Sequence, residues 1–240
     1  MVNADPLVPE RVLPLLRGNF GRPLIHRETC PSTQDLVRGR SQGTVAVTEL
    51  QTAGRGRGER RWECPRSAGI LFSVALTPQT PADRLATLSL TIAEAVSVAL
   101  DPRAQVKWPN DVVVEGRKLA GILLELRSGS LALGVGVNAN LSQDELPAGT
   151  RLPATSLSLL RGEVVDRAAV LVDLLERIEH AYIGYEQKGF SGVERDYLAG
   201  RRVSFEGGGG GECAGIQPDG SLLVDGRAYR FGEVAAVDGD

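Results

Sequence analysis

The sequence predicts an α+β protein with two domains, a larger one over residues 1–199 and a small β-barrel over residues 200–240. Short β-prone runs, bounded by glycine, proline and charged residues, recur between residues 23 and 138. Two longer stretches, residues 84–100 and 166–185, have apolar side chains at helical spacing. After residue 200 only short β-prone runs and turn residues follow, which indicates a separate small β unit.

The composition is that of a globular protein and excludes several classes of function. The chain has 240 residues, 42% hydrophobic and 24% charged, which suffices for one sizeable core and a small appendage. Its formal net charge of −3 argues against a general nucleic-acid coat protein. No apolar window reaches transmembrane length, and residues 1–19 lack the pattern of an export signal. We therefore expect a cytoplasmic protein with no membrane partner.

The cysteines and histidines argue against metal binding through thiolates and against histidine-based nucleophilic catalysis. Cys30, Cys64 and Cys213 are far apart and have no metal-ligand spacing, so we expect free thiols in a reducing compartment. His26 lies in a β-prone run and His180 in a helical pattern, and neither is near a serine or cysteine motif.

The N-terminal part predicts a helix, a strand and a second short helix. Residues 9–17 are the first helix candidate and residues 23–29 the strand. Ser32 or Thr33 can cap the second helix, with Asp35 in its first turn. Such a cap leaves N–H groups and hydroxyls facing outward, although most caps of this kind are structural.

An arginine-rich loop follows the strand predicted for residues 43–50. Residues 51–66 contain two glutamates and five arginines, a local balance of 5 − 2 = +3, with the arginines at positions 55, 57, 60, 61 and 66. This concentration in an acidic protein indicates an anion site. Glycines at 54, 56 and 58 let the backbone approach a ligand closely, and we expect the loop to be mobile until a ligand binds.

Two alternatives for this loop are disfavoured and one stays open. A dinucleotide-binding turn requires a helix directly after the glycines, whereas Trp62 and Pro65 follow here. An arginine-glycine segment that binds nucleic acid usually repeats many times, and this one occurs once. A plain flexible loop remains an alternative, because glycine-rich loops are common.

Residues 69–76 predict a further strand, and residues 84–100 a helix capped by Asp83. One apolar stripe of this helix is assigned to the core, namely Leu85, Leu88, Ile92, Val96 and Leu100.

Residues 106–126 predict a buried hairpin whose two β-prone runs are joined at residues 115–117. Polar groups lie at its ends, namely Lys107, Asn110, Asp111, Lys118 and Gly121. Pro109 makes the corner before the first run stiff. Lysine supplies a point charge to phosphate, and aspartate is a hard oxygen ligand for Mg²⁺. Spacing alone fits a surface hairpin with solvated lysines equally well.

The remaining elements complete the predicted fold. Residues 131–138 form a strand whose Gly134 and Gly136 leave room for a group to lie against the sheet, or mark a bulge. A polar loop covers residues 140–153, and residues 166–185 form an amphipathic helix.

Five stretches, taken together, resemble the biotin protein ligases, which adenylate biotin and attach it to a lysine of a carrier domain. They are PSTQD at 31–35, ELQTAGRGRGERRW at 49–62, KWPND at 107–111, KLAGILLEL at 118–126 and GVGVN at 134–138. The resemblance implies a mixed β-sheet flanked by helices, like that of class II aminoacyl-tRNA synthetases. It also implies that the C-terminal barrel is SH3-like.

The resemblance further implies roles for individual residues. Biotin would be bound by Ser32, Thr33, Gln34, Gln51, Gly54, Arg55, Arg57, Lys118 and Gly121. ATP would be bound by Arg55, Arg57, Arg60, Trp62, Lys107, Asn110 and Asn138. The catalytic residues would be Arg55, Lys107, Asp111 and Lys118, with Asp111 also binding Mg²⁺. The reaction would use ATP, Mg²⁺ and biotin without a tightly bound prosthetic group, and the partner would be the carrier domain of a biotin-dependent carboxylase.

Two departures from the family pattern affect these expectations. Gly58-Glu59-Arg60 replaces a second arginine-glycine repeat, and a glutamate inside an anion-binding loop weakens it locally. The first predicted strand begins at residue 23, which leaves too few residues for the DNA-binding module of some family members, so we expect no repressor function.

Two other functions compete with the ligase. A lipoate or octanoate ligase-type acyltransferase shares the architecture, but its pocket needs no partners for a ureido ring such as Thr33 and Gln51. A non-catalytic biotin sensor would be expected to lack Lys118 or the loop arginines. Strand edges near the hairpin also offer a surface for a homodimer or for the carrier domain.

Overall fold

The structure is a computed structural model that describes residues 5–79, 81, 84–148, 150 and 152–237. It contains a seven-stranded sheet in the order β1-β2-β3-β7-β6-β5-β4 and a five-stranded sheet in the order β11-β10-β9-β8-β12. The strands of the large sheet are β1 (Leu24–Arg27), β2 (Val45–Thr48), β3 (Gly69–Leu76), β4 (Gln105–Lys107), β5 (Asp111–Val114), β6 (Arg117–Arg127) and β7 (Ser130–Asn138). Those of the C-terminal sheet are β8 (Arg202–Phe205), β9 (Gly210–Ile216), β10 (Leu222–Val224), β11 (Arg227–Tyr229) and β12 (Val234–Val237).

The large sheet is mixed, as predicted. Its first pair, β1 and β2, is parallel, and the other neighbouring pairs are antiparallel. Strand β7 follows β6 in the chain but inserts between β6 and β3, so the predicted hairpin and strand 69–76 are joined through it. In the hairpin, Asp111 is opposite Gly121 and Val113 is opposite Lys118.

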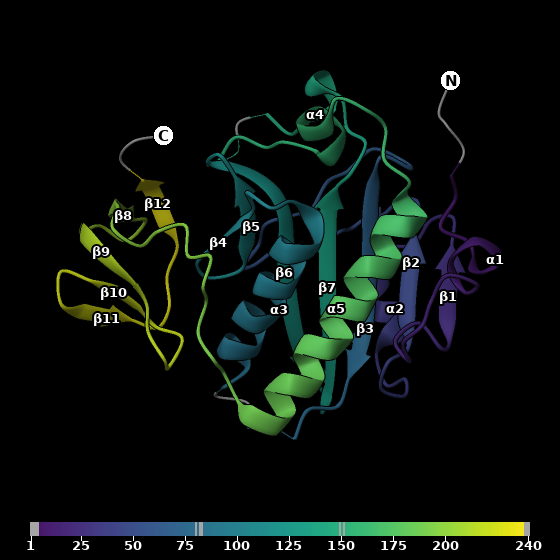
Figure 1. Ribbon diagram of the computed structural model, residues 1–240, viewed down its shortest axis with the longest axis horizontal. Coiled ribbons are helices and arrows are strands. Elements are labelled where there is room, and N and C mark those ends of the chain that lie inside the picture. The colour runs from purple at the N-terminus through teal and green to yellow at the C-terminus, as the bar shows by residue number, and fades with distance from the viewer. Residues whose placement is uncertain (1–4, 80, 82–83, 149, 151, 238–240) are drawn as a thin grey trace.

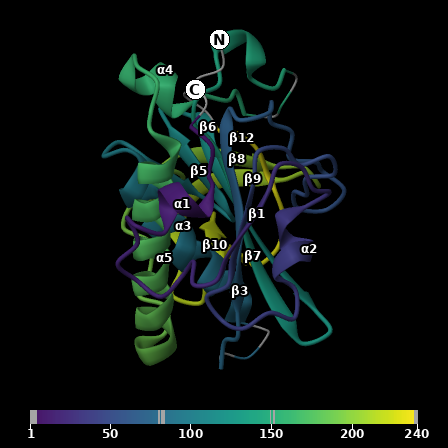
Figure 2. The same ribbon diagram turned by 90° about the vertical axis from the view of Figure 1, so that its right-hand side faces the viewer.

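Helices cover both faces of the large sheet (Figures 1 and 2). The long helices α3 (Leu85–Leu100) and α5 (Arg167–Lys188) pack together on one face. The short helix α2 (Thr33–Val37) lies on the other face, against β2, β3 and β7. The remaining short helices are α1 (Pro9–Val12), η2 (Gln143–Glu145) and α4 (Leu157–Arg161). Because α2 covers only part of its face, the rest of that face is available for a pocket.

Apolar periodicity accounts for the main core. Four members of the predicted α3 stripe have at most 1% of their surface exposed, and Leu85 packs against them half-buried. On β2, Val45 and Val47 face the core with α3 and α5, whereas Ala46 between them packs toward α2. The expected cap Asp83 lies outside the described residues. Helix α5 begins after Asp166, whose carboxylate accepts hydrogen bonds from the backbone N–H groups of residues 168 and 169.

Some predicted boundaries are wrong by a few residues. The first helix ends at Val12 rather than residue 17. The second hairpin strand begins at Arg117, which was expected to belong to the connection, and ends at Arg127. In the glycine run 207–211, residues 207–209 lie in the turn between β8 and β9, and β9 begins at Gly210.

The C-terminal sheet packs against the corner between β4 and β5. The Trp108 indole N–H donates to the carbonyl of Gly220 at 3.1 Å, and Lys107 Nζ donates to the carbonyl of Val234 at 3.4 Å. The connecting segment pairs with β4, since Val106 exchanges backbone hydrogen bonds with Arg195 and Tyr197. This edge of the large sheet is therefore covered by the chain itself. Among the described residues, no helix is long and apolar enough to cross a membrane.

Candidate active site

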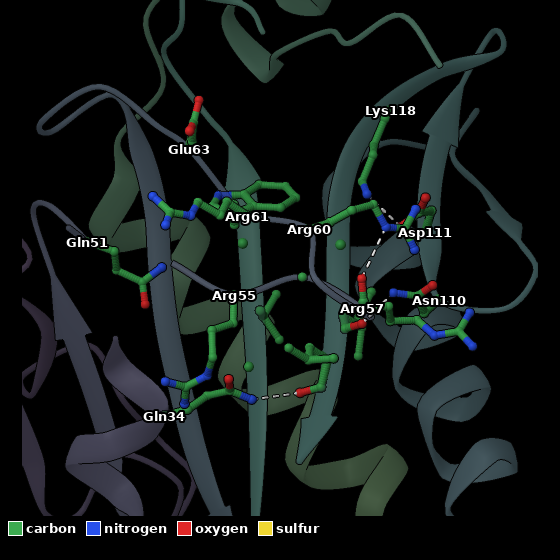
Figure 3. A pocket seen from close by; sticks show the side chains of 18 of the residues that line it. Gln34, Gln51, Arg55, Arg57, Arg60, Arg61, Glu63, Asn110, Asp111 and Lys118 are labelled. Carbon is green, nitrogen blue, oxygen red and sulfur yellow. Dashed lines mark hydrogen bonds and ion pairs between the residues drawn. The ribbon is translucent and has the colours of Figure 1, made fainter. Parts of the chain in front are cut away.

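A cavity of about 650 Å³ lies between the arginine-rich loop and the face of β3, β6 and β7 (Figure 3). Uncharged polar residues line one end, called here the polar end: Ser32, Thr33, Gln34, Gln51 and Ser73. Charged residues line the other, the charged end: Arg57, Arg60, Lys107, Asp111, Lys118 and Glu233. The structure thus brings together segments that are far apart in the sequence.

The polar end is a hydrogen-bonded group built on α2, β3 and the start of the loop. Gln51 Oε1 accepts from the Thr33 backbone N–H at 2.9 Å and from its hydroxyl at 3.2 Å. The Thr33 hydroxyl also lies 2.7 Å from that of Ser73. Because the Gln51 carbonyl oxygen already accepts these two bonds, its NH₂ group is available to donate to a further acceptor. Ser32 occupies the predicted N-cap position but makes no side-chain capping bond.

Ser73 is a site residue that the sequence prediction missed. It is fully buried in the otherwise apolar strand GILFSVAL. A hydroxyl at such a position requires a partner, because a buried polar group without one is costly. That signal was available in the sequence. The identity of the partner, Thr33, was not.

Glycines form the floor of the cavity, and the indole of Trp62 lies against them. A Cβ at Gly136 would lie 2.5 Å from Trp62 Cε2, and one at Gly121 would lie 2.9 Å from its Cζ3. At Gly134 a Cβ would lie 3.0 Å from the amide nitrogen of Gln34. The predicted room above this strand therefore exists, and protein side chains occupy it in this structure.

The charged end is centred on an ion pair between neighbouring strands. Lys118 Nζ lies 2.7 Å from Asp111 Oδ1, and also 5.4 Å from the centre of the Trp62 ring. Asn110 donates its amide to the carbonyl of Ile122 at 2.7 Å, which fixes the corner before β5. Figure 3 shows Lys118, Asp111 and Asn110 on the side of the cavity opposite Gln34 and Gln51.

The donor set fits Mg²⁺ only if phosphates and water supply most of its ligands. The described residues contain no group of three or more side chains that could hold a metal ion. Asp111 offers one hard carboxylate at the charged end, and Mg²⁺ in nucleotide sites is commonly bound by one or two carboxylates plus phosphate oxygens.

Three of the loop arginines, Arg55, Arg57 and Arg60, are directed to carboxylates around the cavity in this structure. Arg55 pairs with Asp35 and Glu125, at 3.0 and 2.9 Å. Arg57 pairs with Glu233 of the C-terminal sheet at 3.0 Å, and Arg60 donates to both oxygens of the same carboxylate. The hydrogen bond from Arg55 holds the pKa of Asp35 below its usual value, despite partial burial. None of these three carboxylates was among the predicted site residues.

Three of the predicted site residues are either buried or outside the cavity lining. Lys107 lines the cavity but is buried, with 3% of its surface exposed, under the C-terminal sheet. Asn138 donates its amide to the carbonyl of Thr155 at 3.0 Å and is not part of the cavity lining. Gly54 is also outside the lining, where its carbonyl accepts from the Trp62 backbone N–H at 3.1 Å. Their roles in ligand binding stay predictions.

The fold is shared with biotin protein ligases of known structure, and the sequence comparisons define the class. The chain belongs to the biotin/lipoate A/B protein ligase family, whose pattern matches residues 26–142. This confirms the resemblance seen in the sequence motifs.

Relatives and solved structures agree with this assignment. The biotin--[acetyl-CoA-carboxylase] ligase of Mycobacterium tuberculosis is 35% identical, over 76% of this chain and 73% of that protein. The protein of the same name from Paracoccus denitrificans is 32% identical, over 81% and 89%. The Aquifex aeolicus biotin protein ligase in complex with biotin and ATP is 30% identical, with a TM-score of 0.79 over 88% of this chain and 97% of that one. The predicted fold class is confirmed.

Proposed function

We propose that this chain is an ATP-dependent biotin protein ligase. In the first step a biotin carboxylate oxygen would attack the α-phosphorus of ATP, releasing pyrophosphate and forming biotinyl-5′-AMP. In the second step the amine of a carrier-domain lysine would attack the acyl carbon, forming an amide and releasing AMP. The observation that carries this proposal is that one cavity joins a hydrogen-bonding end, lined by amides and hydroxyls, to a cationic end.

The polar end suits the ureido ring of biotin. A polar ring in a largely apolar pocket needs a partner for each polar atom, because unpaired buried groups are costly. The Gln51 NH₂ group, whose orientation Thr33 fixes, can donate to the ureido carbonyl. Apolar side chains from the sheet, including Phe72 and Val135, line the space beside this end.

The charged end suits the joining of two anions. A carboxylate and a triphosphate repel one another, so fixed positive charge near the α-phosphate lowers the barrier. Lys118 supplies that charge from a rigid strand, while Arg57 and Arg60 approach from the loop. Asp111 would hold Mg²⁺, which supplies neutralisation of the leaving pyrophosphate.

The second step needs a neutral amine. A lysine amine has a reference pKa of about 10.4, so very little of it is neutral near pH 7. We propose that Asp111 accepts a hydrogen bond from the carrier lysine and orients it. An Asp111→Asn variant should therefore transfer biotin from the preformed adenylate more slowly. An unchanged transfer rate would remove this role.

Pyrophosphate release is the test of the proposed function. The chain is mixed with MgATP and either biotin or lipoate, and labelled biotin is then offered with a carrier domain. Biotin-dependent release followed by transfer supports the ligase. Release with lipoate alone would assign the chain to the lipoate branch of its family, and biotin binding without release would make it a sensor.

Other features of the proposal rest on the sequence. We place the domain boundary at residues 199/200, which is supported by the start of the C-terminal sheet at Arg202. Cytoplasmic location, lack of DNA binding and a homodimer remain predictions. Residues 195–197 cover the edge strand β4, and the backbone of Val106 is paired with them. Strand β1 is the other edge of the large sheet.

A further inference from the structure

The segment from Gly54 to Trp62, called here the loop hairpin, is a folded unit. The Trp62 N–H donates to the Gly54 carbonyl at 3.1 Å, and the Gly56 N–H donates to the Arg60 carbonyl at 2.8 Å. A Cβ at Gly54 would lie 2.3 Å from the Trp62 carbonyl oxygen, so only glycine permits this pairing. These backbone hydrogen bonds join the hairpin to itself and not to the walls of the cavity. Side-chain contacts therefore hold the hairpin over the cavity.

Arg55 fastens the root of the loop hairpin to two separate elements. Its Nε and Nη2 donate to the two oxygens of Glu125 on β6, at 2.9 and 3.0 Å. Its Nη1 and Nη2 donate to the two oxygens of Asp35 on α2, at 3.0 and 3.1 Å. Two bidentate contacts use nearly the whole donor set of a guanidinium and fix its plane.

The surrounding charges stabilise this arrangement. Arg38 lies 3.2 Å from Asp35 and 3.5 Å from Glu125, and Arg127 lies 3.7 Å from Glu125. The cluster therefore has three guanidinium groups for two carboxylates, and each carboxylate is compensated. Glu125 is mostly buried, with 14% of its side chain exposed.

The cluster lies beside the polar end of the cavity. Asp35 belongs to the same short helix as Thr33, and the Leu123 carbonyl on the strand of Glu125 accepts from Gln34 at 3.2 Å. Figure 3 shows the Arg55 side chain directed toward Gln34 and away from Lys118. The guanidinium thus cross-links the loop to the walls around Thr33 and Gln51.

We propose that Asp35 and Glu125 are positioning residues that hold the loop hairpin over the polar end through Arg55. They would act on the affinity for the ring-bearing substrate, biotin, and not on the phosphate chemistry. Arg55 is then an anchor and makes no contact with the triphosphate. The kinetic part of this inference rests on the proposed function, whereas the structural part does not.

The structural test is limited trypsin digestion of the full chain without substrates. Its cleavage sites after Arg57, Arg60 and Arg61 lie within the hairpin itself. Asp35→Asn/Glu125→Gln retains side-chain shape and removes both charges, and Arg55→Met removes the anchor. We expect both variants to be cleaved about 10-fold faster in the hairpin. This corresponds to a loss of about 1.4 kcal/mol in the free energy that favours the closed hairpin over the open one. Arg55→Lys, which keeps the charge but not the fork, should be intermediate.

The matched control is Glu28→Gln, because Glu28 pairs with Arg66 just beyond the hairpin and 72% of its side chain is exposed. This variant should be cleaved like the parent. Adding Glu125→Gln to Arg55→Met should have no further effect, because the contact is already lost. Unchanged hairpin cleavage in both Asp35→Asn/Glu125→Gln and Arg55→Met would overturn the inference, whether or not the chain is a ligase.

The kinetic test is biotin-dependent pyrophosphate release. We expect the KM for biotin to rise about 10-fold in the Asp35→Asn/Glu125→Gln variant, with kcat and the KM for ATP changed less than about threefold. A rise confined to the KM for ATP would show that Arg55 contacts phosphate and would overturn the anchor. If the parent chain releases no pyrophosphate with biotin, the proposed function fails, and the digestion result still decides the structural part.

Discussion

Among the side chains at the charged end, we propose that Lys118 is the residue that stabilises charge on the α-phosphate. Its amine is fixed between the Asp111 carboxylate and the face of the Trp62 indole. A cation held in this way needs no reorganisation when charge develops on a phosphate.

Lys118→Gln should therefore lose adenylate formation. We expect kcat for biotin-dependent pyrophosphate release to fall by about 10²- to 10³-fold, the usual effect of removing one preorganised electrostatic group. Lys188→Gln is the control, since Lys188 lies exposed at the end of α5. Near-normal release by Lys118→Gln would exclude the assigned role.

Gly136→Ala should displace Trp62. The new methyl group would lie 2.5 Å from the indole, so the ring or the strand must shift, and overpacking of this kind costs about 1–3 kcal/mol. We expect a red shift in tryptophan emission and a lower urea midpoint. Gly184→Ala on α5 is the control, because no atom lies within 4 Å of the added Cβ. This variant should leave the tryptophan emission unchanged and should not lower the urea midpoint. Unaltered emission in Gly136→Ala would mean that the indole does not rest on this glycine.

At the scale of elements, the first turn of α5 is tied to the large sheet by a buried charge network. Arg167 has 1% of its side chain exposed and lies 2.9 Å from both Asp5 and Glu49. It also donates to the Gly69 carbonyl at 3.0 Å, at the start of β3. These contacts position β3, which carries Ser73, and the end of β2, which leads to Gln51.

Arg167→Met should be strongly destabilising. Removing one partner leaves Glu49 buried without its cation, and such changes cost about 3–5 kcal/mol. Arg177→Met breaks only the half-exposed pair with Asp173 on the same helix, which is worth about 0.5 kcal/mol or less. Urea unfolding of the two variants compares them directly. Equal losses would contradict the role given to the buried network.

The same network should make stability depend on acid pH. Burial alone would raise the pKa of Glu49, but the Leu7 N–H at 2.8 Å and Arg167 hold it below its usual value. Folding then favours the ionised form, so its contribution is complete above the unfolded pKa of about 4.5 and is lost as pH falls through the lower folded value. The urea midpoint should fall between about pH 5 and pH 3, and Glu49→Gln should show a smaller slope. An identical slope in this variant would assign the acid sensitivity to other carboxylates.

At the scale of the whole molecule, the loop hairpin connects the two sheets. Its root is bound to α2 and β6 through Arg55, and its tip is bound to the C-terminal sheet through Glu233. Arg57 and Arg60, which we propose bind phosphate, are thus paired with a carboxylate in this structure.

Glu233→Gln should release the hairpin tip. We expect faster trypsin cleavage after Arg57 and Arg60, and a KM for ATP lowered by up to about fivefold, because phosphates no longer compete with a carboxylate for half-exposed arginines. The KM for biotin should change less. Glu212→Gln, at an exposed position of β9, is the control. A raised KM for ATP would mean that Glu233 orients the arginines and does not compete with the nucleotide.

Much of the fold follows from local patterns in the sequence. The apolar stripe of α3, the Asp166 cap of α5, the hairpin around residues 115–117 and the turn at 218–220 each depend on neighbouring residues. The five arginines of residues 51–66 also predict an anion site, whereas the polar partners Thr33 and Gln51 were expected only from the resemblance to biotin protein ligases. Each of these signals involves residues that are close together in the sequence, so the sequence alone suffices to detect them.

The tertiary structure decided which groups meet. Arg55 pairs with Glu125, which is 70 residues away in the sequence, and Arg57 pairs with Glu233, which is 176 residues away. The insertion of β7 between β3 and β6 brings the glycines of two strands under Trp62, and the packing of the C-terminal sheet buries Lys107. Periodicity and turn chemistry specify elements, whereas ion-pair partners depend on distances between elements that only the folded chain sets.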